Sequence, residues 1–212
     1  MNTSPQPLPL TLGVTGASGL IYAVQAVKYL LKAEIPVELV ASKATYQVWK
    51  AEQGVQMPAE MNAQAAFWRE QAGGVQTGQL RCHPWSDVGA NIASGSYKTL
   101  GMLIIPCSMS TVGKLAAGLS SDLLERAADV QLKERKPLVL VPRETPFSLI
   151  HLRNLTTLAE AGAHIVPAIP AWYHQPQTIL DLVDFVVARA LDQLDIDCIP
   201  INRWQGQNRP TA

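Results

Sequence analysis

Four short polar segments of this sequence combine residue types that bind anions and move protons. They are Gly16-Ala17-Ser18-Gly19, Ser42-Lys43, Ser108-Met109-Ser110-Thr111 and Arg143-Glu144, and each follows directly on a run of apolar residues. Hydroxyl groups, cations and the backbone N–H groups of a glycine-rich turn all bind phosphate, and a glutamate can carry a proton. Together the segments predict one phosphorylated ligand. An ordinary charged surface turn is the alternative for Arg143 and Glu144.

The glycine-rich segment fits a mononucleotide better than a dinucleotide. The G-x-G-x-x-G pattern of NAD-binding proteins would need glycine where the chain has Val14, and an acid where it has Ser42-Lys43. No G-K-S or G-K-T follows the glycines, so the phosphate-binding loop of ATPases is absent too. We therefore expect this turn to hold a single phosphate, as in FMN. A tight strand–helix turn without a ligand is the alternative.

A second set of polar residues could hold another anion. Arg126 and Lys133 are seven positions apart on one predicted helix, so they share a face. Arg189 stands on an otherwise apolar predicted helix, where a cation usually needs an anionic partner. Tyr173 could add a hydroxyl donor from a loop between prolines. The alternatives are structural salt bridges or subunit contacts for the cations and a packed interface aromatic for Tyr173.

The elements that must position these residues alternate along the chain. Short apolar runs predict strands at 8–14, 37–41, 80–82, 102–106, 138–141 and 165–166, and helical spacing predicts helices at 20–32, 44–53, 62–71, 112–117, 122–135, 148–161 and 178–194. Asp122 and Glu125 predict a capping box at the start of the fifth helix. This alternation is typical of an α/β fold, a three-layer α/β/α sandwich with a Rossmann-like or flavodoxin-like, mostly parallel sheet. The carboxyl ends of parallel strands meet at one edge, so the four polar segments should lie together.

Composition narrows the class of protein. The 212 residues predict a single domain, 1–212, with frayed tails at 1–9 and 205–212. Lys+Arg and Asp+Glu are equal at 17 each, which gives no support for a nucleic-acid or anionic-membrane partner. Charged residues make up only 16%, which favours self-association. No membrane span or metal motif is visible. The three scattered cysteines, Cys82, Cys107 and Cys198, suit a reducing cytoplasm.

Longer segments carry a resemblance to a known family. They are Thr15 to Gly19, Val40 to Lys43, Ala93 to Ser96, Pro106 to Ser108, Glu125 to Val130, Leu132 to Arg135, Pro137 to Phe147, Tyr173 to Gln177 and Arg203-Trp204. On these the chain resembles the UbiX-type flavin prenyltransferases along nearly its whole length. That family lies within the wider superfamily of homo-oligomeric flavin-containing cysteine decarboxylases. The block from Glu125 to Phe147 is the most specific part of the match.

The resemblance implies a metal-independent reaction on a flavin. A dimethylallyl group would pass from dimethylallyl monophosphate to reduced FMN, bonding at N5 and then at C6. The prenylated FMN would serve as the cofactor of a UbiD-type decarboxylase, with ubiquinone precursor or aromatic-acid decarboxylation as the expected pathway. The family is usually a dodecamer with its sites at subunit boundaries, which agrees with the low charge of this chain.

The resemblance also implies roles for single residues. FMN would be held by Gly16, Ala17, Ser18, Ser42, Ser108, Met109, Ser110, Thr111 and Arg143. The prenyl phosphate would be held by Arg126, Lys133, Tyr173 and Arg189. Ser18, Glu52 and Glu144 would be the polar groups near the reacting carbons. Some members of the family have a tryptophan near the position of Val88, where the nearest tryptophan of this chain is Trp85. The aromatic wall of the prenyl pocket therefore stays open.

Two other classes of function share the fold. Flavin-dependent decarboxylases of peptidyl or pantothenoyl cysteine carry Pro-Ala-Ser-Ala-Asn-Thr where this chain has Pro106 to Thr111. They also carry a Met-Asn substrate clamp where this chain has Arg143-Glu144. A non-catalytic flavin-binding partner subunit of a decarboxylase is the other alternative. The set of Arg143, Glu144, Tyr173 and Arg189 argues against it.

Overall fold

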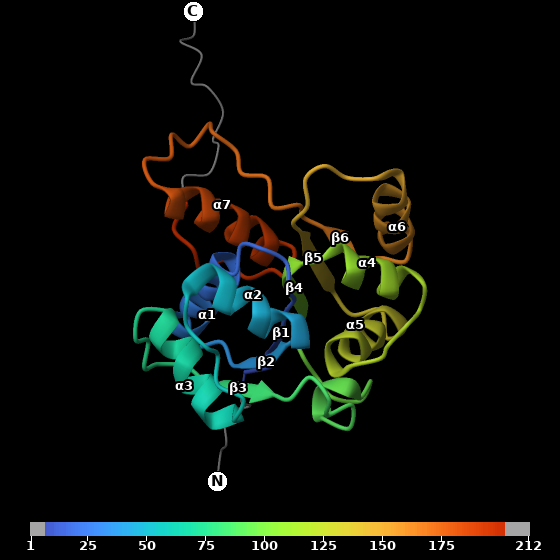
Figure 1. Ribbon diagram of the computed structural model, residues 1–212, viewed down its shortest axis with the longest axis horizontal. Coiled ribbons are helices and arrows are strands. Elements are labelled where there is room, and N and C mark those ends of the chain that lie inside the picture. Colours follow the sequence, from blue (N-terminus) through green and yellow to red (C-terminus); the bar gives the residue numbers. More distant parts are fainter. Residues whose placement is uncertain (1–6, 202–212) are drawn as a thin grey trace, which may run out of the picture.

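One parallel sheet of six strands organises the computed structural model, which describes residues 7–201 (Figure 1). The strands are β1 (Leu10–Val14), β2 (Val37–Ala41), β3 (Leu80–His83), β4 (Gly101–Cys107), β5 (Leu138–Pro142) and β6 (His164–Ile165). Their order is β3-β2-β1-β4-β5-β6, and every neighbouring pair is parallel. This is the Rossmann-like order, in which the chain changes direction across the sheet between β1 and β4. The predicted α/β fold is confirmed.

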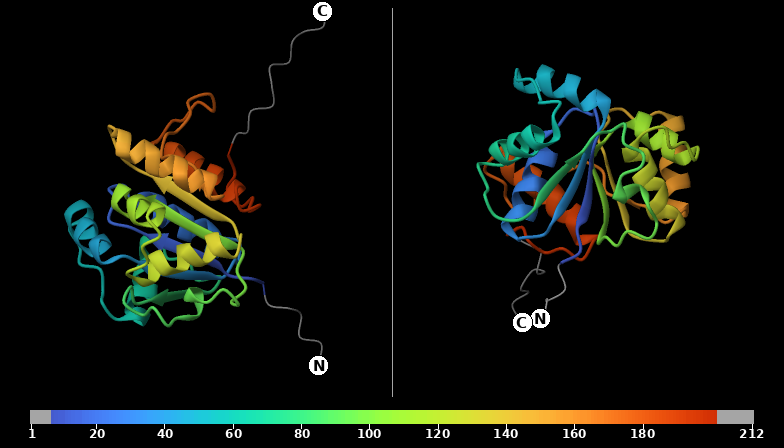
Figure 2. Two further views of the ribbon diagram at one scale, coloured as in Figure 1. Left: turned by 90° about the vertical axis from the view of Figure 1, so that its right-hand side faces the viewer. Right: turned by 90° about the horizontal axis from the view of Figure 1, so that it is seen from below.

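Helices cover both faces of the sheet, as predicted. They are α1 (Ile21–Lys32), α2 (Lys43–Gln53), α3 (Met61–Gln71), α4 (Met109–Ala116), α5 (Leu123–Lys133), α6 (Leu149–Glu160) and α7 (Ile179–Asp192), with a short 3-10 helix, η1 (Asn91–Ala93), that was not predicted. Helices α1 and α7 lie on one face, and α4, α5 and α6 on the other (Figure 2). Helix α2 extends beyond the sheet at the carboxyl ends of the strands (Figure 2). The sandwich therefore has three layers.

The alternation of side chains along each strand divides the core in two. Leu10, Leu12 and Val14 of β1 face the layer of α1 and α7, whereas Met102 and Ile104 of β4 face the layer of α4 and α5. All of these side chains are fully buried. Both faces of the sheet are covered, which is why the strands appear in the sequence as continuous apolar runs rather than alternating ones.

The predicted tails fall largely outside the described residues. Residues 1–6 and 205–212, and the Arg203-Trp204 pair of the family resemblance, are not among them. Residues 7–9 are described, and the Pro9 carbonyl accepts a hydrogen bond of 2.9 Å from the Leu100 N–H. Pro9 is thus tied to the segment that leads into β4, and the frayed tail stays a prediction.

Candidate functional site

The four polar segments lie at one edge of the sheet. They follow β1, β2, β4 and β5, which are consecutive neighbours in the order β2-β1-β4-β5 (Figure 1). The strands are parallel, so all four carboxyl ends open on the same side. The structure thus confirms that these segments share an edge, centred on the change of direction between β1 and β4.

Thr15 closes the junction of β1 and β4, and its position was missed as a site residue. Its hydroxyl donates to the Pro106 carbonyl at 2.7 Å and accepts from the Ser108 N–H at 2.8 Å. The side chain is only 1% exposed. A hydroxyl residue directly after a buried strand was the available signal. Thr15 fixes the spacing between the first and third polar segments.

The glycine-rich turn is held by α2. A Cβ atom on Gly16 would lie 2.5 Å from the Ala44 Cβ, so only glycine lets the start of α2 approach this closely. The Glu52 carboxylate reaches back from the end of α2 and accepts from the N–H groups of Gly19, at 2.9 Å, and Leu20, at 3.3 Å. A carboxylate thus bonds these two N–H groups, as anions commonly do at a helix start. Phosphate binding at this turn stays a prediction.

Ser42 is the residue before α2, where its backbone N–H donates to the Val14 carbonyl at 2.8 Å. Its hydroxyl lies 3.1 Å from the Thr45 hydroxyl and makes no bond to the backbone of the helix. The ammonium of the next residue, Lys43, lies 5.8 Å from the centre of the Trp85 ring. Ser42 is thus anchored through its backbone, and its hydroxyl lies against the buried Thr45 hydroxyl, which donates to the Val14 carbonyl at 2.8 Å.

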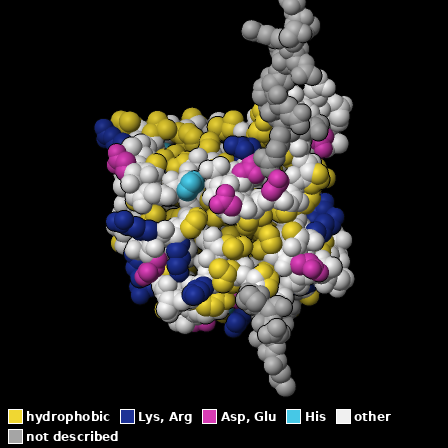
Figure 3. Space-filling view, turned by 180° about the vertical axis from the view of Figure 1, so that it is seen from behind, with side chains coloured by type: hydrophobic (Ala, Val, Ile, Leu, Met, Phe, Trp, Pro, Cys, Tyr) yellow, Lys and Arg dark blue, Asp and Glu magenta, His cyan; other side chains and the backbone are white. Residues whose placement is uncertain are grey.

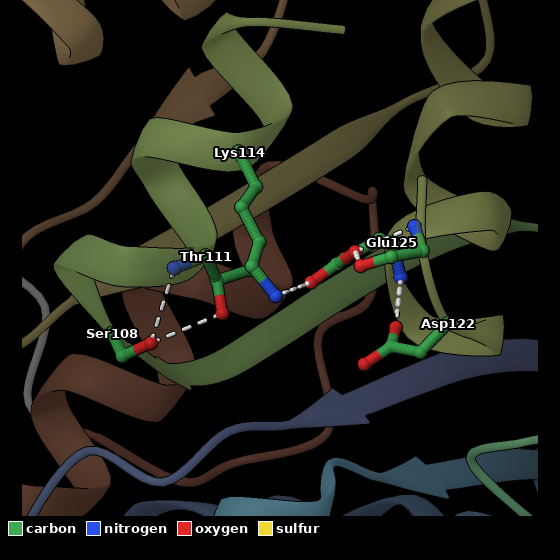
Figure 4. A network of polar contacts seen from close by, with 6 residues as sticks. Ser108, Thr111, Lys114, Asp122 and Glu125 are labelled. Carbon is green, nitrogen blue, oxygen red and sulfur yellow. Dashed lines mark hydrogen bonds and ion pairs between the residues drawn. The ribbon is translucent and has the colours of Figure 1, made fainter. Parts of the chain in front are cut away.

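Residues 109–111 belong to α4 and not to a loop, which corrects the predicted start of this helix at residue 112. The Ser108 hydroxyl caps the helix by accepting from the Thr111 N–H at 3.2 Å, and it lies 3.0 Å from the Thr111 hydroxyl (Figure 4). Met109 is 7% exposed and packs in the core. Its side chain is therefore structural, and Ser110 is exposed.

Arg143 and Glu144 follow β5 at the same edge. The Arg143 N–H donates to the Cys107 carbonyl at 3.2 Å, while the buried Nε atom of its guanidinium has no hydrogen-bond partner. Burial raises the pKa of the Tyr22 phenol, and the positive charge of Arg143 acts against that rise. The Tyr22 ring also lies 3.2 Å from where a Cβ atom on Gly19 would be. Tyr22, which was not predicted, therefore belongs to this edge.

The Glu144 carboxylate is oriented by its own turn. Its Oε1 atom accepts from the Thr145 N–H at 3.1 Å, and the residue is half-buried. A glutamate carboxylate is a group that can carry a proton. The structure brings Glu144 to the same edge as Ser18 and Glu52, the other two predicted polar groups.

The second predicted set is not brought together within one chain. Arg126 and Lys133 are both exposed on α5, which confirms their shared face. Lys133 pairs with Glu134 and lies beside Gly95, near the amino end of β4. Arg189 is exposed on α7, in the opposite layer, where it donates to Asp192 at 2.6 Å. The predicted anionic partner exists, but it is a neighbour on the same helix.

Tyr173 contacts α7, the helix that carries Arg189. Its ring packs edge-on against Phe185 of α7, at 5.8 Å between ring centres.

The start of α5 also differs from the prediction. Asp122 does cap the helix by accepting from the Glu125 N–H at 2.9 Å. The capping box itself is wrong, because the Glu125 carboxylate bonds Ser121 and Lys114 instead.

Trp85, the tryptophan nearest to Val88 in the sequence, lines a cavity of about 410 Å³ together with Lys43, Tyr46 and Met61. Val88 itself is 53% exposed. The cavity reaches the second polar segment through Lys43.

Within residues 7–201, no three or more His, Cys, Asp or Glu side chains are grouped so as to hold a metal ion. Over the same residues, none of the helices has the length and apolar character that crossing a membrane requires. The three cysteines are free.

Comparisons with known proteins agree on one family. The family model described as Flavoprotein matches residues 2–191. A flavin prenyltransferase UbiX from Synechocystis sp. is 74% identical over 198 residues, which cover 93% of this chain and 96% of that protein.

Two solved structures superpose on nearly the whole chain. The structure of AnUbiX (PadA1) in complex with FMN and dimethylallyl pyrophosphate has a TM-score of 0.83 at 35% identity, covering 96% of this chain and 100% of that one. A dodecameric FMN-dependent UbiX-like decarboxylase from Escherichia coli O157:H7 has a TM-score of 0.79 at 38% identity, covering 94% and 100%.

Proposed function

Because this chain belongs to the flavoprotein family and, within it, to the UbiX-type flavin prenyltransferases, we propose that it moves a dimethylallyl group from dimethylallyl monophosphate to reduced FMN. The group would bond at N5 and then at C6 of the flavin. A solved relative, AnUbiX, binds FMN and dimethylallyl pyrophosphate, which supports both ligand classes. The prenylated FMN would pass to a UbiD-type decarboxylase.

The observation that carries this proposal is the buried Nε atom of Arg143, which has no hydrogen-bond partner at an edge rich in hydroxyl groups. A buried Nε–H without an acceptor is costly unless a ligand supplies one. The edge offers donors on three sides: the turn at Gly16 to Ser18, the Ser42 hydroxyl, and the Ser108–Thr111 pair. These residues fit the phosphate and polar ring atoms of FMN. When bound, reduced FMN supplies the ring nitrogen and carbon that accept the prenyl group.

The chain's own residues would govern departure of the phosphate. Breaking the allylic C–O bond leaves extra negative charge on the phosphate, which fixed cations stabilise. Arg126, Lys133 and Arg189, with the Tyr173 hydroxyl, would supply this stabilisation, and no metal ion is then required. The aromatic wall at Trp85 would keep water away from the allylic carbon.

A proton must leave C6 for the second bond to form. Glu144 would take it, since its carboxylate is held at this edge by the Thr145 N–H. Ser18 is exposed at the same edge and would relay it. Glu52 would keep the turn at Gly19 in place, and could exchange these backbone bonds for a contact with the ligand.

Several copies of the chain would build each phosphate site. Arg126 and Lys133 lie in one layer and Arg189 in the other, so one copy does not bring them together. Hydrophobic side chains cover much of the surface seen in Figure 3. Among the described residues, large hydrophobic side chains that are exposed include Leu149, Ile150, Ile169, Trp172 and Ile179. Such exposure supports self-association, and the dodecameric relative supports a dodecamer.

The cellular setting is part of the proposal. Three free cysteines support a reducing cytoplasm. We expect residues 1–212 to work as a single flavoprotein domain, because one sheet carries all four polar segments.

A direct test is to incubate the protein without oxygen with reduced FMN and dimethylallyl monophosphate, and to take a mass spectrum of the extracted flavin. We expect a flavin that carries one additional five-carbon unit. Recovery of FMN alone, from protein that binds both ligands, would contradict the proposal and favour a flavin-binding partner subunit. Oxidative decarboxylation of a cysteine-terminated peptide would instead favour the cysteine decarboxylase alternative.

A further inference from the structure

A buried carboxylate lies behind the start of α4. Glu125 is only 3% exposed. One oxygen accepts from the Lys114 ammonium at 2.6 Å, and the other accepts from the Ser121 N–H at 2.8 Å and the Ser121 hydroxyl at 2.5 Å (Figure 4). None of these three residues has been placed in contact with a ligand. Both oxygens of Glu125 accept hydrogen bonds, so the network needs no ligand to be complete. Its role therefore depends on the two helices that it connects.

The network joins the helix that carries the Ser108–Thr111 hydroxyl pair to the start of α5. Lys114 lies three residues after Thr111 and therefore on the same face of α4. Long side chains on a helix lean toward its amino end, and the Lys114 side chain points across to Glu125 on α5 (Figure 4). Glu125 in turn precedes Arg126, one of the cations proposed for the prenyl phosphate.

Helix α4 needs such support. It has only eight residues, from Met109 to Ala116, and helices this short are marginal without tertiary contacts. Apolar packing fixes the depth of α4 through Met109, Val112 and Leu115. Packing alone is non-directional, so rotation of α4 about its own axis is better opposed by a directional bond. The Lys114–Glu125 pair is such a bond.

Charge makes this pair sensitive to loss of either member. Burial acts to raise the pKa of the Glu125 carboxyl, but hydrogen bonds from Lys114 and Ser121 outweigh it and hold the pKa below its usual range. Removing Lys114 would leave an unpaired charge in a buried place, which is strongly unfavourable. The local structure would then shift to bring water or another donor to Glu125. Helix α4 would lose this directional bond to α5, so its rotation about its own axis would be less restrained.

We propose that Lys114 and Glu125 are positioning residues of the flavin site, whose ion pair sets the rotation of α4 and so keeps the Ser108 and Thr111 hydroxyls turned toward FMN. This rests on the proposed function, in which those hydroxyls bind the flavin. The pair acts through Ser108 and Thr111 and touches no ligand.

The test is a double-mutant cycle on FMN binding. Lys114→Met, Glu125→Gln and the double variant are compared with the unaltered protein for the Kd of FMN, by quenching of its fluorescence, and for kcat at saturating FMN. We expect each single change to raise the Kd about tenfold, as loss of a charged hydrogen bond can. The kcat stays within about twofold, and the double variant loses less than the two single effects combined. Lys114→Arg, which keeps the charge, restores the affinity.

A matched control separates positioning from general stability. Glu38→Gln removes another buried carboxylate with two side-chain partners, His83 at 2.5 Å and Tyr97 at 2.8 Å, far from α4. It should lower the melting temperature and leave the Kd unchanged. The inference would be overturned if the effects of the Lys114 and Glu125 changes were non-additive for the melting temperature but additive for the Kd of FMN. Failure of Lys114→Arg to restore FMN binding would overturn it as well. Ser108→Ala tests the premise separately: an unchanged Kd there would remove the flavin from this edge, whatever the cycle shows.

Discussion

The edge proposed to bind flavin, formed by the four polar segments, differs from the cations proposed to bind phosphate, Arg126, Lys133 and Arg189. The difference lies in how far a single chain brings the groups together and holds them in place. At the edge, Thr15 joins β1 to β4, Glu52 holds the glycine-rich turn, and Ser108 caps α4, so the groups are bonded in place without a ligand. The cations behave in the opposite way. Arg189 and Lys133 are exposed in different layers and pair with neighbours on their own helices. Under the proposed function, flavin recognition would therefore depend on the fold of one chain, and phosphate recognition on the assembly of several.

The largest expected effect falls on the chemistry. Glu144→Gln should lower kcat by about 10²–10⁴-fold, because the amide cannot accept the proton. The Kd of FMN should change little, since the amide keeps the shape of the turn. Stopped-flow measurement of product formation, with flavin binding measured alongside, checks both. Glu160→Gln, an exposed glutamate on α6, is the control. Equal losses in kcat and flavin affinity would place Glu144 in binding and not in catalysis.

The next effect tests the prepared edge. Gly16→Ala puts a methyl group 2.5 Å from the Ala44 Cβ and 2.9 Å from its carbonyl carbon. The start of α2 must move, and overpacking of this kind costs about 1–3 kcal/mol. We expect FMN affinity to fall by about 10–100-fold, measured by isothermal titration. Gly89→Ala, whose Cβ would meet nothing closer than 3.5 Å, should bind normally. Normal binding by both variants would show that the turn is not rigid.

The cations should give a smaller effect and a sharper pattern. Arg126→Ala and Arg189→Ala should each raise the KM for dimethylallyl monophosphate about tenfold with flavin affinity kept. Lys32→Ala, an exposed lysine on α1, serves as control. If a site takes these arginines from different copies, co-expressed variants should restore about a quarter of the sites by random assortment. No recovery in mixed oligomers would mean that one copy supplies both arginines.

The smallest expected effect is on stability at low pH, and it comes from Glu38, which lies in neither of the two regions. Burial acts to raise the pKa of the Glu38 carboxyl, but hydrogen bonds from His83 and Tyr97 outweigh it and leave the pKa below its usual range. A lowered pKa in the folded state adds stability above the unfolded value of about 4.3, and this stability is lost as the pH falls through the folded value. Melting temperatures from about pH 6 to pH 3 should therefore fall more steeply for the unaltered protein than for Glu38→Gln. Parallel curves would contradict this.

Local patterns predicted most of the fold. The apolar run of β2 predicts its observed bounds. Helices α2 and α6 end just before Gly54 and Gly162, the glycines that predict these ends, and both glycines have positive φ. The predicted start of α4, at residue 112, is three residues too late. A serine such as Ser108 is common both in loops and before helices, and the sequence does not show which N–H group its hydroxyl caps. The capping box at Asp122 failed for a related reason: a lysine from another helix competes for Glu125.

The candidate site was predictable where it depends on strand order, and not where it depends on distant partners. Parallel strands bring Ser42, Ser108 and Arg143 to one edge by topology alone. The bonds of Glu52 to Gly19 and Leu20 join residues more than thirty positions apart, and no periodic pattern in the sequence predicts them. Tyr22 was missed because a tyrosine in an amphipathic helix is usually a packing residue. The separation of Arg126 from Arg189 follows from the layers of the sandwich.

The bond from the Ser108 amide to the Thr15 hydroxyl has a further consequence for dynamics. A buried amide is usually protected from exchange with solvent deuterium by a backbone carbonyl. The Ser108 amide, directly after β4, is instead bonded by the side chain of Thr15, directly after β1. The Ser108 hydrogen can exchange only when the ends of β1 and β4 separate or the Thr15 side chain rotates. Its exchange rate therefore reports opening of the edge, residue by residue and without any ligand.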